Sequence, residues 1–197
     1  MKKKAFILNL IIFILELIGL IMTFVNDKRL AIEFYTNDSN IIMLICSGLY
    51  IVYYVLKKEI PKWLQTFRFI CTSALAVTFI VVVLVLAPMY DFSYGWMLFY
   101  KQLIIYHTLG PILSIVSFIF FEKYHSNKVL PAITYTFVYG IIMIILNIFK
   151  IVDGPYPFLR VYEQSATMSV LWFFIILGVN YVISYSLLKL NKKSNIL

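Results

Sequence analysis

Six long apolar runs, separated by short charged loops, occupy almost the whole of this 197-residue chain. They predict helices at about 5–25, 35–57, 67–88, 101–122, 129–149 and 165–189. A membrane span needs about 20 largely apolar residues, and each run with its flanks supplies that length. Because lipid offers no partner for a free backbone N–H or C=O, each run should be a helix. The sequence therefore predicts one all-α domain over residues 1–197, a polytopic six-helix transmembrane bundle.

The distribution of basic residues predicts an orientation for this bundle. If the N-terminus is cytoplasmic, 12 of the Lys and Arg residues fall on the inner side and 5 on the outer side. This positive-inside bias predicts a multi-pass protein of the cell membrane with both termini in the cytoplasm, and with the loops 26–40, 89–100 and 150–165 outside. The net charge of +8 is then a topology signal. No basic stripe interleaves with stacking aromatic residues, so a nucleic-acid partner is not expected. The 14 Lys against 3 Arg are typical of an AT-rich bacterial genome.

The usual motifs of soluble enzymes and of metal sites are missing from the sequence. It has no G-x-S-x-G elbow, no H-E-x-x-H and no phosphate-binding glycine loop. Cys46 and Cys71 both fall within apolar runs, which is typical of small buried hydrophobes. His107 has no Cys, Asp or Glu at ligand spacing. No metal and no cofactor are therefore expected.

Ionisable and hydrogen-bonding side chains at membrane depth are costly, so each one is a candidate functional residue. Glu16 lies within the first run, and Asn147 and Lys150 end the fifth. We interpret these three residues as possible intramembrane polar partners. For Glu16 the alternative is a carboxyl group that is protonated or paired inside the bundle.

The second and fourth runs carry the candidate catalytic residues. Thr36 and Asn40 are four residues apart at the start of the second run and share a helical face. Taken alone, this start favours helix capping over chemistry, because Thr, Asn, Asp and Ser all cap helices well. His107 is the one histidine within a predicted span, and Pro111 removes the helical bond to its carbonyl. Its ring can act as a base or as a packing group.

Two outer loops are rich in aromatic residues. The loop 89–100 has the composition of an interfacial aromatic belt. The segment 153–159 reads Asp-Gly-Pro-Tyr-Pro-Phe-Leu, and its prolines restrict the backbone. We expect this segment to cover the outer mouth of the bundle and to pack Tyr156 or Phe158 towards the second and fourth helices.

These motifs together resemble a known family. The segment 34–40, His107 with Pro111, and the segment 154–159 resemble the six-span androgen-inducible and androgen-dependent membrane proteins, and more closely their bacterial six-helix relatives. The animal members hydrolyse fatty acid esters of hydroxy fatty acids through an intramembrane Thr and a His. The resemblance implies that Thr36 is the nucleophile and His107 the base. Asn40, Tyr156 and Phe158 would then bind substrate or support the oxyanion.

Three functions remain open at this point. The first is a hydrolase of lipid esters at the outer leaflet, with a membrane lipid or lipid-like molecule as substrate. The second is a non-catalytic transporter or ligand-binding protein with a polar cavity around His107, and the third is a structural or partner-binding role. The sequence does not define the acyl chain or the oligomeric state.

The hydrolase hypothesis makes a geometric prediction. Thr36 Oγ1 should lie about 2.6–3.2 Å from a His107 ring nitrogen, or somewhat further without substrate. A crude depth estimate at 1.5 Å per residue opposes this: Thr36 lies roughly 32 Å above Lys57, whereas His107 lies roughly 22 Å above Glu122. A separation above about 8 Å would make Thr36 a helix cap.

Overall fold

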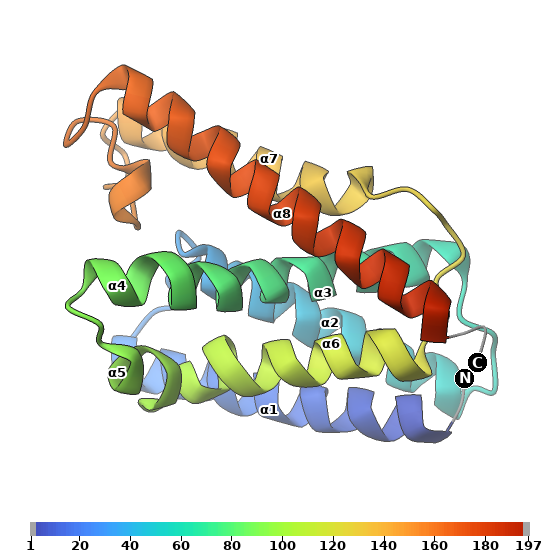
Figure 1. The fold of residues 1–197 in the computed structure, drawn as a ribbon. Coiled ribbons are helices and arrows are strands. Elements are labelled where there is room, and N and C mark those ends of the chain that lie inside the picture. Colours follow the sequence, from blue (N-terminus) through green and yellow to red (C-terminus); the bar gives the residue numbers. More distant parts are fainter. Residues whose placement is uncertain (1–2, 195–197) are drawn as a thin grey trace.

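Helices form every regular element of the protein within residues 3–194, the part of the chain that this computed structural model describes (Figure 1). The longer helices are α1 (Lys3–Asp27), α2 (Tyr35–Val55), α3 (Lys62–Val81), α6 (Gly110–Phe121), α7 (Leu130–Ile148) and α8 (Ala166–Ser194). The shorter ones are η1 (Val82–Leu86), α4 (Ala87–Met89), α5 (Tyr94–Phe99), η2 (Ile105–Leu109) and η3 (Pro157–Leu159). The predicted all-α class is confirmed.

Five helices are long and apolar enough to cross a membrane. They are α1, α2, the continuous stretch Lys62–Met89, α7 and α8. The fourth predicted run is also helical over Ile105–Phe121, but this helix is shorter than the other five. By length and composition, the chain is a multi-pass membrane protein with five candidate spans.

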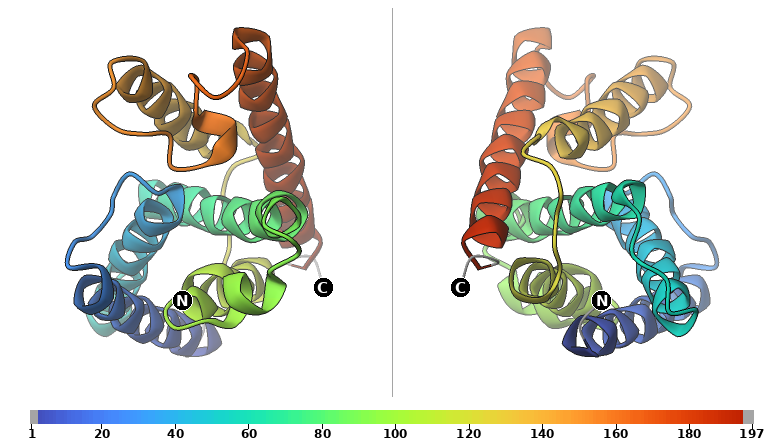
Figure 2. Two further views of the ribbon diagram at one scale, coloured as in Figure 1. Left: turned by 90° about the vertical axis from the view of Figure 1, so that its left-hand side faces the viewer. Right: turned by 90° about the vertical axis from the view of Figure 1, so that its right-hand side faces the viewer.

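The helices form two groups. Viewed along the bundle, α1, α2, α3 and α6 surround a common centre, and each contacts its two neighbours (Figure 2). The pair α7–α8 packs on one side of this group, mainly against α3. Towards the end that carries η3, the pair diverges from the four-helix group (Figure 1). α3 therefore lies between the two groups and is the most buried of the candidate spans.

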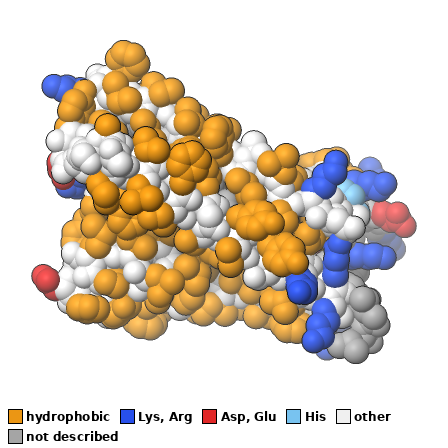
Figure 3. Space-filling view, turned by 45° about the horizontal axis from the view of Figure 1, so that its top comes forward, with side chains coloured by type: hydrophobic (Ala, Val, Ile, Leu, Met, Phe, Trp, Pro, Cys, Tyr) orange, Lys and Arg blue, Asp and Glu red, His pale blue; other side chains and the backbone are white. Residues whose placement is uncertain are grey.

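Many polar side chains lie inside the bundle, together with an apolar core, whereas apolar side chains cover most of its outer surface. On α1 the buried face carries Asn9, Glu16 and Thr23 at seven-residue intervals, whereas Ile14 and Ile21 are exposed. Figure 3 shows the hydrophobic side chains spread over the outer surface, with most of the visible Lys and Arg side chains at one end. This arrangement suits a chain whose surroundings are lipid and whose interior must satisfy its own hydrogen bonds.

α3 begins at Lys62, earlier than the predicted 67–88. The count of basic residues placed Arg68 among those that face the cytoplasm. Instead Arg68 is fully buried in the second turn of α3 and forms an ion pair with Glu122, with Nε 3.0 Å from Oε2. This pair offsets part of the cost of burying the guanidinium group.

Two π-helical turns, η1 and η2, interrupt the helices at the same end of the bundle. η1 continues α3 and η2 precedes α6. Each ends two residues before a proline, Pro88 or Pro111, which has no N–H to continue the α-helical bonding. A π turn holds one residue more than an α turn, and such turns are frequent at functional sites.

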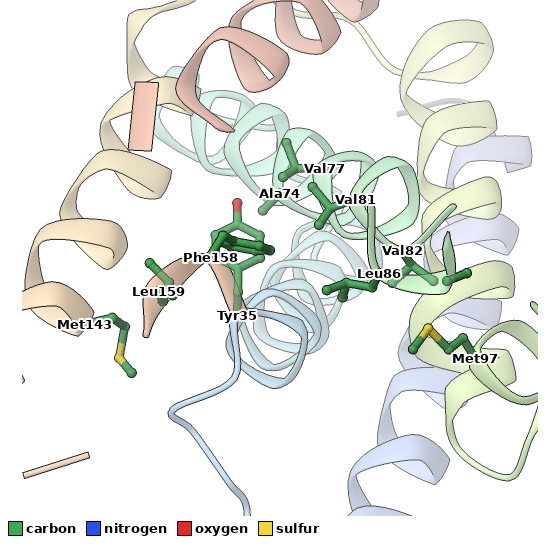
Figure 4. Close-up of a cluster of buried hydrophobic side chains, with 11 residues drawn as sticks. Tyr35, Ala74, Val77, Val81, Val82, Leu86, Met97, Met143, Phe158 and Leu159 are labelled. Carbon is green, nitrogen blue, oxygen red and sulfur yellow. The ribbon is translucent and has the colours of Figure 1, made fainter. Parts of the chain in front are cut away.

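A cluster of buried apolar residues joins the two groups of helices at this end (Figure 4). Tyr35 from α2, Val77 and Val81 from α3, and Phe158 and Leu159 from η3 belong to it. The Tyr35 hydroxyl also bonds Thr136 Oγ1 on α7 at 2.8 Å, and Thr136 accepts a bond from Asn180 on α8. α2, α7 and α8 are thereby held together beside the site described next.

Candidate functional site

Thr36 is the second residue of α2. Phe34 is the N-cap, and its side chain makes no capping hydrogen bond. The capping interpretation of Thr36 is therefore wrong, since Thr36 lies inside the helix. The N–H groups of the first turn have no partner within the helix. Negative charge near this end is stabilised by the helix dipole.

His107 lies in the middle of η2, and its ring is oriented by α5. Nδ1 is 2.6 Å from the carbonyl oxygen of Met97, near the C-terminal end of α5. The next residue, Thr108, also bonds α5, because its Oγ1 donates to the Leu98 carbonyl at 2.9 Å. A carbonyl oxygen can only accept, so Nδ1 must carry the proton of the ring. In a neutral imidazole the other nitrogen, Nε2, is then an acceptor.

Nε2 of His107 faces the hydroxyl of Thr36 at 3.4 Å. Both side chains are buried, each with about 8% of its surface exposed. The predicted proximity of Thr36 and His107 is confirmed, at a distance slightly longer than a tight hydrogen bond. The hydroxyl can donate to Nε2, which is the arrangement that a general base requires.

Tyr156, from the segment before η3, reaches the same hydroxyl. Its Oη lies 3.4 Å from Thr36 Oγ1 and accepts a hydrogen bond from the Thr36 backbone N–H at 3.3 Å. Burial raises the pKa of the Tyr156 phenol, so the hydroxyl stays protonated and can donate. The segment covers this end of the bundle as predicted.

A glycine and an amide hold the segment in place. A side chain on Gly154 would lie 2.6 Å from the backbone of Leu159, so this close approach requires glycine. Asn147 donates to the Val152 carbonyl at 3.1 Å and accepts from the Val161 N–H at 2.8 Å. Asn147 thus organises the loop and does not contact Thr36 or His107. Lys150 lies over the ring of Tyr162, 5.1 Å from its centroid, and is exposed to solvent.

An apolar cavity of about 60 Å³ adjoins Thr36 between the two groups of helices. Phe158, predicted to contact substrate, is buried in its wall, where it stacks on Tyr156 and packs against Trp172 of α8. The remaining wall comes from α2, α3, η1, α7 and α8 and includes Tyr35, Val77, Val81, Thr136 and Ile176.

A second, larger cavity of about 750 Å³ lies on the other side of Thr36. It reaches His107, and its wall combines apolar residues such as Trp96 and Leu103 with polar and charged ones, among them Asn37, Asp27, Asp91, Lys101 and Gln102. Three residues border both cavities, namely Thr36, Leu86 and Tyr156. Thr36 therefore lies at the junction of a small apolar cavity and a larger vestibule that also offers polar and charged groups.

Asn40 and Glu16 lie one helical turn deeper than the Thr36–His107 pair. The Asn40 Nδ2 group donates to the Thr36 carbonyl at 2.6 Å, so this donor is engaged by backbone. Glu16 is buried with 1% of its surface exposed. Neither of its carboxyl oxygens, nor Asn40 Oδ1, has a hydrogen-bond partner within residues 3–194.

Sequence reasoning missed two features of this interior. The first is the Met97 carbonyl, a backbone group without any side-chain signal. The second is the set of side chains around Glu122, which accepts bonds from Arg68, from Asn9 at 3.0 Å and from Ser117 at 2.6 Å. The seven-residue spacing of Asn9 and Glu16 on one apolar run was the available signal for a polar interior.

Comparison of the chain with protein-family models, with curated proteins and with solved structures finds no match. The family resemblance drawn from the motifs therefore stays a prediction, and any function must be argued from the geometry.

Proposed function

We propose that the protein is an intramembrane hydrolase of lipid esters, with Thr36 as nucleophile and His107 as general base. The observation that carries the proposal is the orientation of His107. The Met97 carbonyl fixes the proton on Nδ1, and Nε2 is left as an acceptor facing the Thr36 hydroxyl. This is the relationship among nucleophile, base and orienting group that activates a hydroxyl, with a backbone carbonyl as the orienting group.

The two cavities support an ester with one apolar and one polar part. The apolar cavity has room for a few methylene groups, since one water-sized group occupies about 10–15 Å³. A longer acyl chain would continue between α3 and the α7–α8 pair into lipid. The vestibule has the size of an ordinary ligand site and offers Lys101 to an anionic group. An acyl ester placed across Thr36 would present its carbonyl carbon to Oγ1.

The reaction follows from these positions. His107 Nε2 removes the Oγ1 proton as Oγ1 attacks the ester carbonyl carbon. The carbonyl oxygen takes the negative charge beside the Tyr156 hydroxyl and the positive end of α2. The leaving alkoxide takes the proton from His107, and an acyl ester on Thr36 remains. Water from the vestibule, deprotonated by His107, then releases the fatty acid and restores the Thr36 hydroxyl.

The proposal includes an orientation in the cell membrane. It takes Ile105–Phe121 as a sixth, shorter span and places the site at the outer leaflet, with both ends of the chain cytoplasmic. The gathering of Lys and Arg at the opposite end supports this orientation (Figure 3). Cysteines introduced at Lys28 and Asp153 should react with an impermeant maleimide in intact cells, unlike one at Lys192. Reaction at Lys192 alone would contradict it.

Labelling of the purified protein with a fluorophosphonate probe tests the catalytic pair. The wild type and Thr36→Ser should be labelled, because both keep a hydroxyl. Thr36→Ala and His107→Ala should lose labelling by more than a hundredfold while the protein remains folded. Thr134→Ala is a matched control, since Thr134 is exposed on α7 and bonds its own helix at the Leu130 carbonyl.

Unchanged labelling of Thr36→Ala would place the reactive residue elsewhere. Hydrolysis of chromogenic acyl esters of several chain lengths provides the second measurement. A folded wild type that neither reacts with the probe nor hydrolyses any ester would contradict the hydrolase proposal.

A second candidate function is a transporter or ligand-binding membrane protein, and the buried polar interior favours it. Polar side chains continue inward from His107 through Ser114 and Ser117 to Glu122, all buried. Such residues inside a bundle often mark the path of a substrate or an ion. In proteoliposomes a hydrolase would release fatty acid from an added ester, whereas a transporter would move its substrate across unchanged.

A further inference from the structure

Glu16 is the carboxyl group that α1 brings into the bundle, and neither of its oxygens has a hydrogen-bond partner within residues 3–194. It faces α6 at Gly110, and the space that a side chain on Gly110 would need is taken by its Oε1. Asn40 Oδ1 lies 3.4 Å from that same position. Two oxygens from α1 and α2 therefore converge beside the glycine of α6, directly beneath Thr36 and His107.

Two unpartnered acceptors cannot face each other at low cost. A buried acceptor without a partner loses its hydration and gains nothing in return. A carboxylate loses far more, because its charge is also removed from water. A single proton on Glu16 removes the buried charge and provides a donor for Asn40 Oδ1.

The nearest buried cation does not offer another solution. Arg68 is bound directly to Glu122, so its single positive charge is already balanced. A second carboxylate in the same interior would leave one negative charge uncompensated at membrane depth.

We infer that Glu16 is held as a neutral carboxylic acid whose proton binds Asn40 Oδ1, and that this bond positions Thr36. Asn40 transmits the effect, because its Nδ2 group bonds the Thr36 carbonyl at 2.6 Å. Glu16 exchanges no proton with Thr36 or His107 in the proposed reaction, so it is a positioning residue. The protonation does not depend on the proposed hydrolase function, whereas its consequence for catalysis does.

Infrared spectroscopy of the purified protein in lipid nanodiscs at neutral pH tests the protonation. The wild type minus Glu16→Gln difference spectrum should contain the C=O stretch of a carboxylic acid and no carboxylate bands. In Asn40→Leu the acid band should remain but shift, because the O–H loses its acceptor. Glu163→Gln is the control, since Glu163 is exposed in the loop before α8 and should not change the acid region. Carboxylate bands in the Glu16 difference spectrum would overturn the inference.

The rate of fluorophosphonate labelling tests the positioning role. Glu16→Leu, which cannot donate, should slow labelling about tenfold, the equivalent of one hydrogen bond. Glu16→Gln keeps an N–H donor towards Asn40 and should restore most of the rate. An equal loss in both variants would contradict positioning by this bond. If the wild type is not labelled at all, the hydrolase proposal fails, whereas the infrared result still decides the state of Glu16.

Discussion

Two glutamates lie in the interior of the same four-helix group, and their surroundings are opposite. Glu122 accepts hydrogen bonds from Arg68, Asn9 and Ser117, so its charge is matched and its oxygens are bonded. Glu16 has no such donor within the described chain, and its neighbour is another acceptor, Asn40 Oδ1. Glu122 lies near the end where α1 begins and Glu16 one turn below the candidate site.

A buried carboxyl group can therefore have two unrelated purposes in one bundle. A carboxylate with an Arg partner and further donors holds three helices together, here α1, α3 and α6, and removing one partner is costly. A carboxyl group with only acceptors near it must hold a proton, and its value lies in the donor that this proton provides. The predictions below compare the two environments.

The same substitution at the two positions should have very different effects. Glu122→Gln leaves Arg68 buried without its counter-charge and should lower the free energy of unfolding by about 3–5 kcal/mol. Glu16→Gln replaces one neutral donor with another and should cost less than about 1 kcal/mol. Reversible unfolding in mixed detergent micelles measures both. Equal losses of unfolding free energy would show that Glu16 is charged and paired, and would contradict the difference between the two glutamates.

Removing a single donor from Glu122 should have an intermediate effect. Ser117→Ala deletes the 2.6 Å hydrogen bond to Oε1 and should cost about 2 kcal/mol, as expected for a bond to a charged group. Ser186→Ala is the control, because Ser186 is exposed on α8 and bonds its own helix at the Val182 carbonyl. It should change the free energy of unfolding by less than about 0.5 kcal/mol. A similar loss in both serine variants would contradict a special role for the Glu122 network.

A smaller effect is expected from filling the space beside Glu16. In Gly110→Ala the new methyl group meets Glu16 Oε1 and lies 3.0 Å from the Ile105 carbonyl. Overpacking costs about 1–3 kcal/mol, and the better helix propensity of Ala returns part of it, so a net loss of about 1 kcal/mol is expected.

Gly178→Ala is the matched control for this substitution. Gly178 lies in α8, where a methyl group would meet nothing within 4 Å. The same change should raise the free energy of unfolding by about 0.5–1 kcal/mol, because only the helix propensity changes. A stabilising Gly110→Ala would show that Glu16 moves away freely.

The fold class was accessible from the sequence because the lengths of the apolar runs directly reflect the thickness of a bilayer. The start of α3 was less accessible. Its first two turns contain Lys62, Gln65 and Arg68, which a search for apolar runs rejects. The partner of Arg68, Glu122, lies 54 positions away from it, and no local pattern records that pairing.

The site could be predicted as a set of side chains but not as a geometry. The sequence singled out three side chains by their position: Thr36 at the start of an apolar run, His107 within one, and Tyr156 between two prolines. Counting residues from Lys57 and Glu122 misjudged their relative depth by roughly 10 Å, because it treated both as markers of one level. Glu122 in fact pairs with Arg68, which lies about 9 Å along α3 from Lys62 at 1.5 Å per residue. Glu122 therefore lies deeper than the start of α3 and is not a marker of the membrane surface, and the contact between Thr36 and His107 needs no hinge.

The two π turns, η1 and η2, allow the candidate site to change during evolution while the helix bundle stays the same. Each π turn is equivalent to one inserted residue, and each residue of a helix advances the direction of its side chains by about 100°. Loss of one residue from η2 would leave α6 and its apolar faces in register with α1 and α3. The side chains that precede the deletion would be rotated by about 100° relative to α6. An imidazole at position 107 would then no longer point towards α2. The insertion or deletion of a single codon could thus create or remove the site while the membrane scaffold stays intact. Related bundles with and without the proposed Thr36–His107 pair are therefore an expected outcome of this architecture.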